Sequence, residues 1–181
     1  KILSDNGIKI FTNTKVLDIK DSDDISIVKL SSGETLKFEK ILASTGRRPN
    51  TQNIGLEKLG VKLGEYGHVI VNDKMSTSVN GIYAVGDVTG GRYAHEAIQH
   101  GVVAAENSMK MNSTMKGQII PRCIYSIPEI ACVGLTEDDA KKKSSILVGK
   151  FYLKASGRAM TLGETDGFVK VIIDKKTQRF L

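Results

Sequence analysis

The sequence is poor in cysteine and contains no long apolar run. Its two cysteines, Cys123 and Cys132, are too few for a disulfide framework or a structural zinc site, and they lack the CxxC or CxxxxC spacing of a redox pair. We therefore expect two buried, reduced thiols, no bound metal and a reducing compartment. No stretch of about 18 apolar residues occurs, which excludes a membrane-spanning helix. Residues 1–7 also lack the apolar segment of a signal peptide.

A clustered basic stripe is missing as well. The net charge of +6 comes from 26 basic and 20 acidic residues, but the lysines are scattered and interleaved with acids. Proteins that bind nucleic acids more often gather basic and aromatic residues on one stripe. We interpret the basic excess as a solvated surface and expect no nucleic-acid partner. The 181-residue length and the 40% hydrophobic content are typical of a soluble globular protein of one or two domains.

Short alternating segments dominate the N-terminal part of the chain. Residues 8–20, 25–30 and 36–43 each carry apolar residues broken by polar ones, and turn-rich residues 21–24 and 31–33 separate them. Such short strands with tight turns favour an antiparallel meander over a βαβ repeat. We predict a three-stranded antiparallel unit.

A strand followed by a helix is the clearest predicted pair of elements. Residues 82–85 indicate a short buried strand, and residues 94–111 indicate a helix. We assign its buried face to Ala94, Ala97, Ile98, Gly101, Val102, Ala105 and Met109, which recur at spacings of three and four. Asp87 follows the strand directly, where α/β folds place ligands, and the helix N-terminus offers free amides to a phosphate. A lone Gly86-Asp87 pair is more often an ordinary turn.

The last third of the chain predicts two strand pairs and a capped helix. A polar linker is expected at residues 112–117. Thr136 precedes three acids and then three lysines, the charge order that stabilises a helix at both ends. The four strands are expected at residues 123–125, 131–133, 146–154 and 168–173. The chain ends on what resembles the start of another strand, so we expect a further C-terminal segment.

Longer motifs carry a family resemblance. Residues 77–87 (TSVNGIYAVGD) resemble the second flavin-binding motif of the FAD-dependent pyridine nucleotide–disulfide oxidoreductases, and residues 44–50 (STGRRPN) resemble the motif that joins their NAD and FAD domains. Residues 93–97 (YAHEA) are similar to the helix start of the dihydrolipoamide dehydrogenase branch. Pieces of its interface domain are matched at residues 120–131, 133–137 and 155–159. The resemblance is ordered and covers nearly the whole chain.

This resemblance implies an α/β fold with α+β organisation in its C-terminal part. Residues 1–48 would be the end of a Rossmann-like NAD-binding domain, residues 49–117 the second FAD-binding segment, and residues 118–181 the first half of an α+β dimerisation domain. The family's Gly-rich fingerprints, its redox CxxxxC and its C-terminal His/Glu pair are absent from the sequence. We therefore expect a piece of a longer protein with no catalytic residue of its own.

The resemblance also implies a flavin site. Asp87 would bind the ribityl or pyrophosphate part of FAD. Arg92, Tyr93, Ala94 and His95 would lie against the isoalloxazine, with backbone amides near its O2 side. Tyr93 stands where the family usually has Leu, so its side-chain contact departs from the family pattern.

A nicotinamide site is implied as well. Gly46 would let the backbone approach NAD, and Val16 would line its adenine end, although simple core packing explains Val16 equally well. His68 and His100 match no acid/base pattern of the family, and we interpret both as polar surface residues.

The resemblance implies a homodimeric enzyme that oxidises protein-bound dihydrolipoyl groups and passes the electrons through a redox disulfide and FAD to NAD+. Each active site would use two chains, and the partner would be the lipoyl domain of a 2-oxo acid dehydrogenase or glycine cleavage complex. The expected compartment is the cytoplasm, or the mitochondrial matrix in a eukaryote. Another branch, such as mercuric or glutathione reductase, and a non-enzymatic interaction module remain alternatives.

Overall fold

A computed structural model describes residues 2–22 and 24–181 of the chain. The chain divides between Arg47 and Arg48 into two compact units, the N-terminal unit and the C-terminal unit, and each is described by itself.

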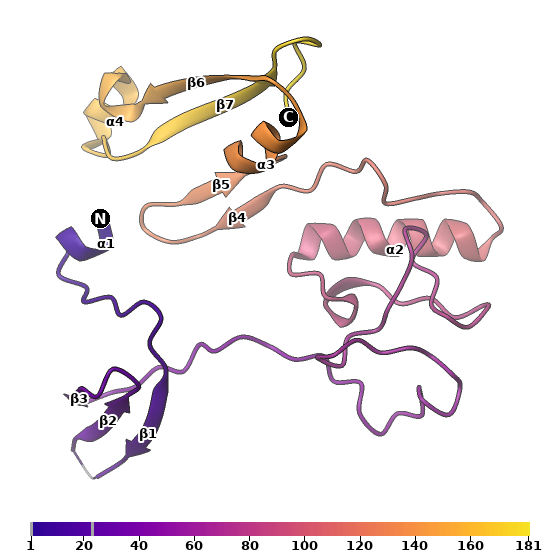
Figure 1. The fold of residues 1–181 in the computed structure, drawn as a ribbon, viewed down its shortest axis with the longest axis horizontal. Helices are drawn as coiled ribbons and strands as arrows, with labels where there is room; N and C mark the ends of the chain where they lie inside the picture. Colours follow the sequence, from indigo (N-terminus) through magenta and orange to yellow (C-terminus); the bar gives the residue numbers. More distant parts are fainter. Residues whose placement is uncertain (1, 23) are drawn as a thin grey trace. The chain divides into compact units, whose positions relative to one another are not determined.

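The N-terminal unit is an antiparallel meander preceded by the short helix α1 (Ile2–Asp5). Its three strands are hydrogen-bonded in the order β1-β2-β3 (Figure 1). They span β1 (Val16–Lys20), β2 (Ser26–Leu30) and β3 (Thr35–Phe38). Alternate residues of β2 are buried, as the period of two along a strand requires. The predicted three-stranded unit is confirmed.

The first strand is shorter than predicted. Residues 8–15 are not in a strand, and β1 begins at Val16. Asn13 has φ of +54°, a left-handed conformation that interrupts extended backbone. Irregular backbone with a turn at residues 12–13 therefore replaces the first part of the expected strand.

Loops and isolated bridges make up most of residues 48–93 in the C-terminal unit. The prediction of a buried strand at residues 82–85 is wrong: Tyr83 forms a single bridge to Ser76, and Val85 is 37% exposed. A strand needs a continuous ladder with a neighbour, and the described residues offer this segment only one bridge. The segment does place Gly86 and Asp87 at the start of a 3-10 helix, Gly86–Thr89.

Helix α2 (Ala94–Ser108) ends three residues before the predicted end at residue 111. Lys110 adopts φ of +65°, and the Met111 N–H donates to the Glu106 carbonyl at 3.0 Å. This pattern closes a helix by turning its last carbonyls back onto the chain. The helix is therefore terminated locally.

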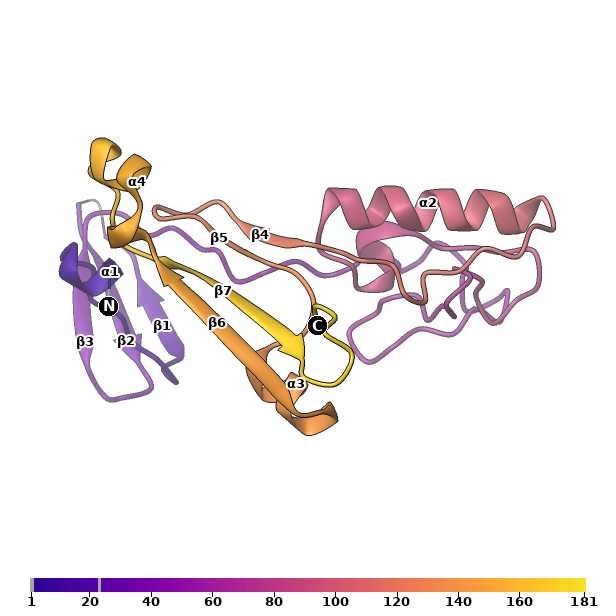
Figure 2. The ribbon, with the colours of Figure 1, turned by 90° about the horizontal axis from the view of Figure 1, so that it is seen from above.

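The predicted buried face of α2 is also wrong. The buried residues of the helix are His100, Val103, Ala104 and Asn107. Figure 2 shows the loops of residues 48–93 gathered along one side of α2. The core there comprises Met75, Val103 and Ala104, with Val71, Tyr83 and Met115 packed against it. Ile98 and Met109, on the predicted face, are 63% and 77% exposed. Among the described residues, the large side chains on the more apolar face of α2 are therefore mostly exposed.

Asn107 fastens the segment after α2. Its side-chain amide donates to the carbonyls of Lys74, Val103 and Ser113, and its oxygen accepts from the Ser113 N–H at 3.1 Å. The Met115 N–H donates to the Asp73 carbonyl. Residues 112–117, expected as a linker, are therefore held against the helix and the loops beside it.

Two antiparallel strand pairs follow, as predicted. The strands are β4 (Arg122–Ile124), β5 (Ile130–Cys132), β6 (Ile146–Tyr152) and β7 (Phe168–Asp174). The 3-10 helix Leu153–Ala155 and helix α4 (Gly157–Leu162) connect β6 to β7.

The expected burial of the cysteines is wrong: both are free, Cys123 is half-buried and Cys132 is exposed. The β4–β5 pair has only two strands and leaves that side chain open to solvent.

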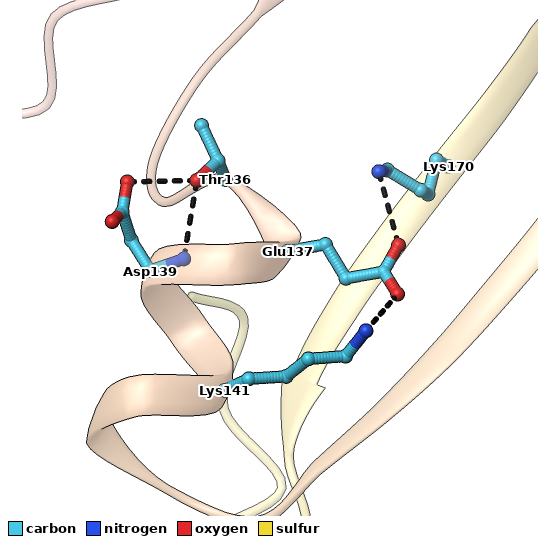
Figure 3. A network of polar contacts seen from close by, with 5 residues as sticks. All are labelled: Thr136, Glu137, Asp139, Lys141 and Lys170. Atoms are coloured by element: carbon cyan, nitrogen blue, oxygen red, sulfur yellow. Dashed lines mark hydrogen bonds and ion pairs between the residues drawn. The ribbon is translucent and has the colours of Figure 1, made fainter.

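Helix α3 (Glu137–Lys143) confirms the predicted capped helix (Figure 3). The Thr136 hydroxyl accepts from the Asp139 N–H at 3.2 Å and donates to the Asp139 carboxylate at 2.7 Å. Glu137 accepts from Lys141 at 2.7 Å and from Lys170 of β7 at 3.2 Å. These two bonds, the Lys141 bond first, lower the pKa of Glu137. The same carboxylate thereby ties α3 to the β6–β7 pair.

Candidate functional site

The Gly86-Asp87 turn is held in a tight, well-bonded conformation. Gly86 is buried with φ of +72°, a value that suits glycine. The Thr89 hydroxyl donates to the Gly86 carbonyl at 2.8 Å, and the Gly90 N–H donates to the Asp87 carbonyl at 3.0 Å. The Asp87 side chain remains exposed. The turn therefore presents a carboxylate that is free to accept hydrogen bonds from a ligand.

The N-terminus of α2 lies beside this turn. A Cβ on Gly86 would stand 3.1 Å from the Ala97 Cβ, so the turn packs directly on the first turns of the helix. Tyr93 is the N-cap, and its side chain makes no capping bond. The first amides of a helix have no acceptor within it, so those of Ala94 and His95 are available to an electron-rich group.

Residues 86–92, here called the Asp87 loop, are bonded to α2 at both ends. The Gly86 N–H donates to His100 Nδ1 at 3.2 Å, and the Arg92 N–H donates to Glu96 Oε2 at 3.1 Å. His100 is only 7% exposed, so its interpretation as a surface residue is wrong. The contact spans 14 positions, and the sequence carries no local signal for it.

The side chains of Tyr93 and His95 contact each other at the start of α2. Their rings stack with centroids 5.5 Å apart, and His95 Nε2 lies 2.7 Å from the Pro121 carbonyl. The departure from the family's usual Leu therefore gives Tyr93 a partner within this chain. The stacking fixes the His95 side chain next to the segment that leads into β4.

The two residues expected at NAD belong to the N-terminal unit. Gly46 has φ of +97°, and a Cβ there would meet no atom within 4 Å, so the backbone is open to approach. Val16 pairs with Leu30 and is 56% exposed, which contradicts simple core packing within the described residues.

His68 is half-buried, and its ring fills the space beside Gly64. Within residues 2–22 and 24–181, no group of His, Cys, Asp and Glu could hold a metal ion.

Two family models match this sequence. The model described as pyridine nucleotide-disulphide oxidoreductase matches residues 1–106, and that of the dimerisation domain of the same proteins matches residues 120–181. The chain therefore belongs to the pyridine nucleotide–disulphide oxidoreductase family. Its mixed helix and sheet structure agrees with the expected fold class of Rossmann-like parts followed by part of a dimerisation domain. Among the described residues, the helices fall short of the length and hydrophobicity that a membrane-spanning segment requires.

Several dihydrolipoyl dehydrogenases are similar to the chain over its full length. The enzyme of Thermus scotoductus is 42% identical over 100% of this chain and 41% of its own length. That of Bacillus subtilis is 43% identical over 99% of this chain and 40% of its own length. The mitochondrial enzyme of Sus scrofa is 39% identical over 100% of this chain and 37% of its own length. The chain thus spans about two fifths of the length of these relatives.

Solved structures agree with this assignment. LpdA from Mycobacterium tuberculosis matches with a TM-score of 0.91 and 25% identity, over 99% of this chain and 40% of that one. The HOCl-induced flavoprotein disulfide reductase RclA from Escherichia coli matches with a TM-score of 0.87 and 29% identity, over 99% and 42%. Both similarities extend across the N-terminal and C-terminal units.

Proposed function

We propose that this chain is the part of a dihydrolipoyl dehydrogenase that holds the second flavin-binding segment and the start of the dimerisation domain. The full-length protein would oxidise protein-bound dihydrolipoyl groups and reduce NAD+. The observation that carries this proposal is the 42–43% identity to bacterial dihydrolipoyl dehydrogenases over essentially the whole chain. The Ala94-His95 helix start lies within that similarity.

The residues around the Asp87 loop suit FAD. An exposed carboxylate at Asp87 matches the hydroxyls of a ribityl chain, and charge-assisted bonds of this kind are strong. The uncapped amides of Ala94 and His95, at the positive end of the α2 dipole, match the electron-rich O2 edge of a flavin. Bound FAD would supply the two-electron chemistry between a dithiol and NAD+. Arg92 and Tyr93 would complete the contact from the turn before the helix.

The NAD site, the partners and the compartment follow from the same proposal. Gly46 would allow close approach of the nicotinamide nucleotide, and the exposed Val16 would face its adenine end. The partner would be a lipoyl domain of a 2-oxo acid dehydrogenase or glycine cleavage complex, and the enzyme would be a homodimer. It would work in the cytoplasm, or in the mitochondrial matrix if the source is eukaryotic, as the name of the Sus scrofa relative suggests.

A flavin-dependent disulfide reductase with a different substrate is the second candidate. The observation in its favour is the structural similarity to RclA at 29% identity, slightly above the identity to LpdA. In that case FAD would bind as proposed here, while the dithiol substrate and the direction of electron flow would differ.

Purified full-length protein that carries this chain tests both candidates. We expect a flavin absorbance spectrum and rapid NAD+-dependent oxidation of dihydrolipoamide. Rapid reduction of glutathione disulfide or Hg(II) by NADPH, with slow oxidation of dihydrolipoamide, would favour the second candidate. A protein without bound flavin that cannot be reconstituted with FAD would contradict both and favour a non-enzymatic module.

A further inference from the structure

Two side chains of α2 hold the Asp87 loop closed. His100 accepts from the Gly86 N–H at the first residue of the loop, and Glu96 accepts from the Arg92 N–H at the last. Both acceptors lie on one face of the helix, four residues apart. Both ends of the loop are therefore bonded to α2, and the loop lies beside the N-terminus of that helix.

The bond to His100 fixes the state of the imidazole. Because Nδ1 accepts a hydrogen bond, the ring proton must be on Nε2, and a doubly protonated ring would have no acceptor for Gly86. Nε2 faces Glu96 Oε1 at 4.0 Å, while the other carboxylate oxygen bonds to Arg92. The 4.0 Å separation is beyond hydrogen-bond distance, so His100 and Glu96 hold the two ends of the loop through separate bonds.

We propose that His100 and Glu96 are positioning residues for FAD, which act through the amides of Gly86 and Arg92. This inference rests on the proposed flavin site. By holding the loop in place before the ligand arrives, the two side chains orient Asp87 and the α2 amides toward one ligand. The affinity for FAD is then higher, because binding has to order less of the protein. Neither side chain has to touch the cofactor.

The inference separates an acceptor role from a packing role. In His100→Asn the side-chain oxygen lies the same number of bonds from Cα as Nδ1, so it can still accept from Gly86. His100→Leu keeps an apolar side chain of similar reach but leaves the buried Gly86 N–H without a partner. The full-length protein is the system for the test, since the proposed site needs the rest of the flavin domain.

The experiment measures FAD affinity by titrating apoprotein with FAD and following flavin fluorescence. We expect His100→Leu to weaken binding by about tenfold and His100→Asn to stay within about threefold of wild type. We also expect the Gly86 amide to exchange its hydrogen about tenfold faster in His100→Leu apoprotein. Equal FAD affinity in wild type and His100→Leu, or equal weakening by Asn and Leu, overturns the inference.

Glu96 provides an independent pair of variants should the His100→Leu protein not fold. Glu96→Gln keeps an oxygen for the Arg92 N–H, and Glu96→Ala removes it. We expect weaker FAD binding only in Glu96→Ala, and equal affinity of the two variants contradicts the role of Glu96. A wild-type protein that binds no FAD would contradict both the proposed function and this inference. Tight binding by wild type and by all substituted proteins removes the inference alone.

Discussion

Asp87 is the exposed second residue of the tightly bonded Asp87 loop, and no side chain of the described residues engages its carboxylate. In the full-length protein we expect Asp87→Ala to weaken FAD binding by about 10- to 100-fold, because a hydrogen bond to a charged acceptor is lost. Asp87→Asn keeps the shape and one oxygen and should lose less. Equilibrium titration of the apoprotein with FAD measures both. Unchanged flavin affinity in Asp87→Ala would remove this residue from the proposed site.

Gly86 combines a left-handed backbone with a close neighbour. Gly86→Ala would adopt an unfavourable φ and bring its Cβ to 3.1 Å from Ala97, whereas Gly90 has φ of +93° and open space around it. We expect Gly90→Ala to lower the free energy of unfolding by about 1–2 kcal/mol and Gly86→Ala to lower it further. Denaturant unfolding of the FAD-free full-length protein compares them. Equal losses would show that contact with α2 contributes nothing.

Residue-scale prediction from sequence succeeded where the signal was local. Gly86-Asp87 and the Ala94-His95 helix start stand beside one another as expected, although their roles toward FAD stay predictions. The role of His100 was missed because its ring accepts a hydrogen bond from the Gly86 amide, which is 14 positions away in the sequence. His100, Val103 and Asn107 recur at the same three- and four-residue spacing as the more apolar face. Hydrophobicity alone therefore predicted the wrong buried face of α2.

Helix α3 depends on a single hydroxyl cap. Thr136→Ala removes the acceptor for the Asp139 N–H, and the loss of such a cap typically costs about 1 kcal/mol. We therefore expect the amides of α3 to exchange about fivefold faster, measured by hydrogen exchange. Thr136→Ser keeps the hydroxyl and should behave as wild type. Identical exchange in Thr136→Ala and wild type would mean that the cap does not limit helix stability.

Hydrogen bonds in the turn after β7 make the stability of the folded protein depend on pH in the acid range. The Thr177 amide, with its hydroxyl and the Lys176 amide, donates to Asp174 and lowers the pKa of that carboxyl to about 2. A group whose pKa is depressed by folding stabilises the folded state fully above its ordinary value of 3.8, and this contribution disappears as pH falls through about 2. An NMR titration of Asp174 should show a midpoint near 2. Asp174→Asn should abolish the loss of stability that this carboxyl causes between pH 4 and 2, and a midpoint near 3.8 would contradict the bonding.

Elements were predictable where their partners are close in sequence. The N-terminal meander, the β4–β5 and β6–β7 pairs and α3 each form from neighbouring segments, so alternation and capping were sufficient. Residues 82–85 carry the apolar pattern of a buried strand but find only the bridge to Ser76. The end of α2 was missed because Lys110, and not a glycine, adopts the left-handed conformation.

At the scale of the whole molecule, large apolar side chains outnumber the places that bury them. Among the described residues, the core cluster beside α2 comprises the small set Met75, Val103 and Ala104, while Ile98 and Met109 of α2 are mostly exposed. The β6–β7 pair leaves large side chains on both faces at least 42% exposed: Leu147, Val148, Phe151, Tyr152, Phe168 and Val169. Contiguous apolar surface of this kind usually marks an interface. In the full-length enzyme proposed above, we expect further protein to cover these faces.

Assembly is the property that this exposed surface controls most directly. Residues 120–181 match the family's dimerisation domain, and in the enzyme proposed above each active site would be shared by two chains. Obligate dimers typically bury more than about 2,000 Å² of largely apolar surface, which the exposed β6–β7 faces can help to supply. We expect the full-length protein to be a homodimer in light scattering, and the 181-residue chain alone to be monomeric or irregularly associated, without retained flavin and without a sharp melting transition. Full-length protein that stays monomeric and active at nanomolar concentration would overturn the shared-site argument, because each active site would then be complete within one chain.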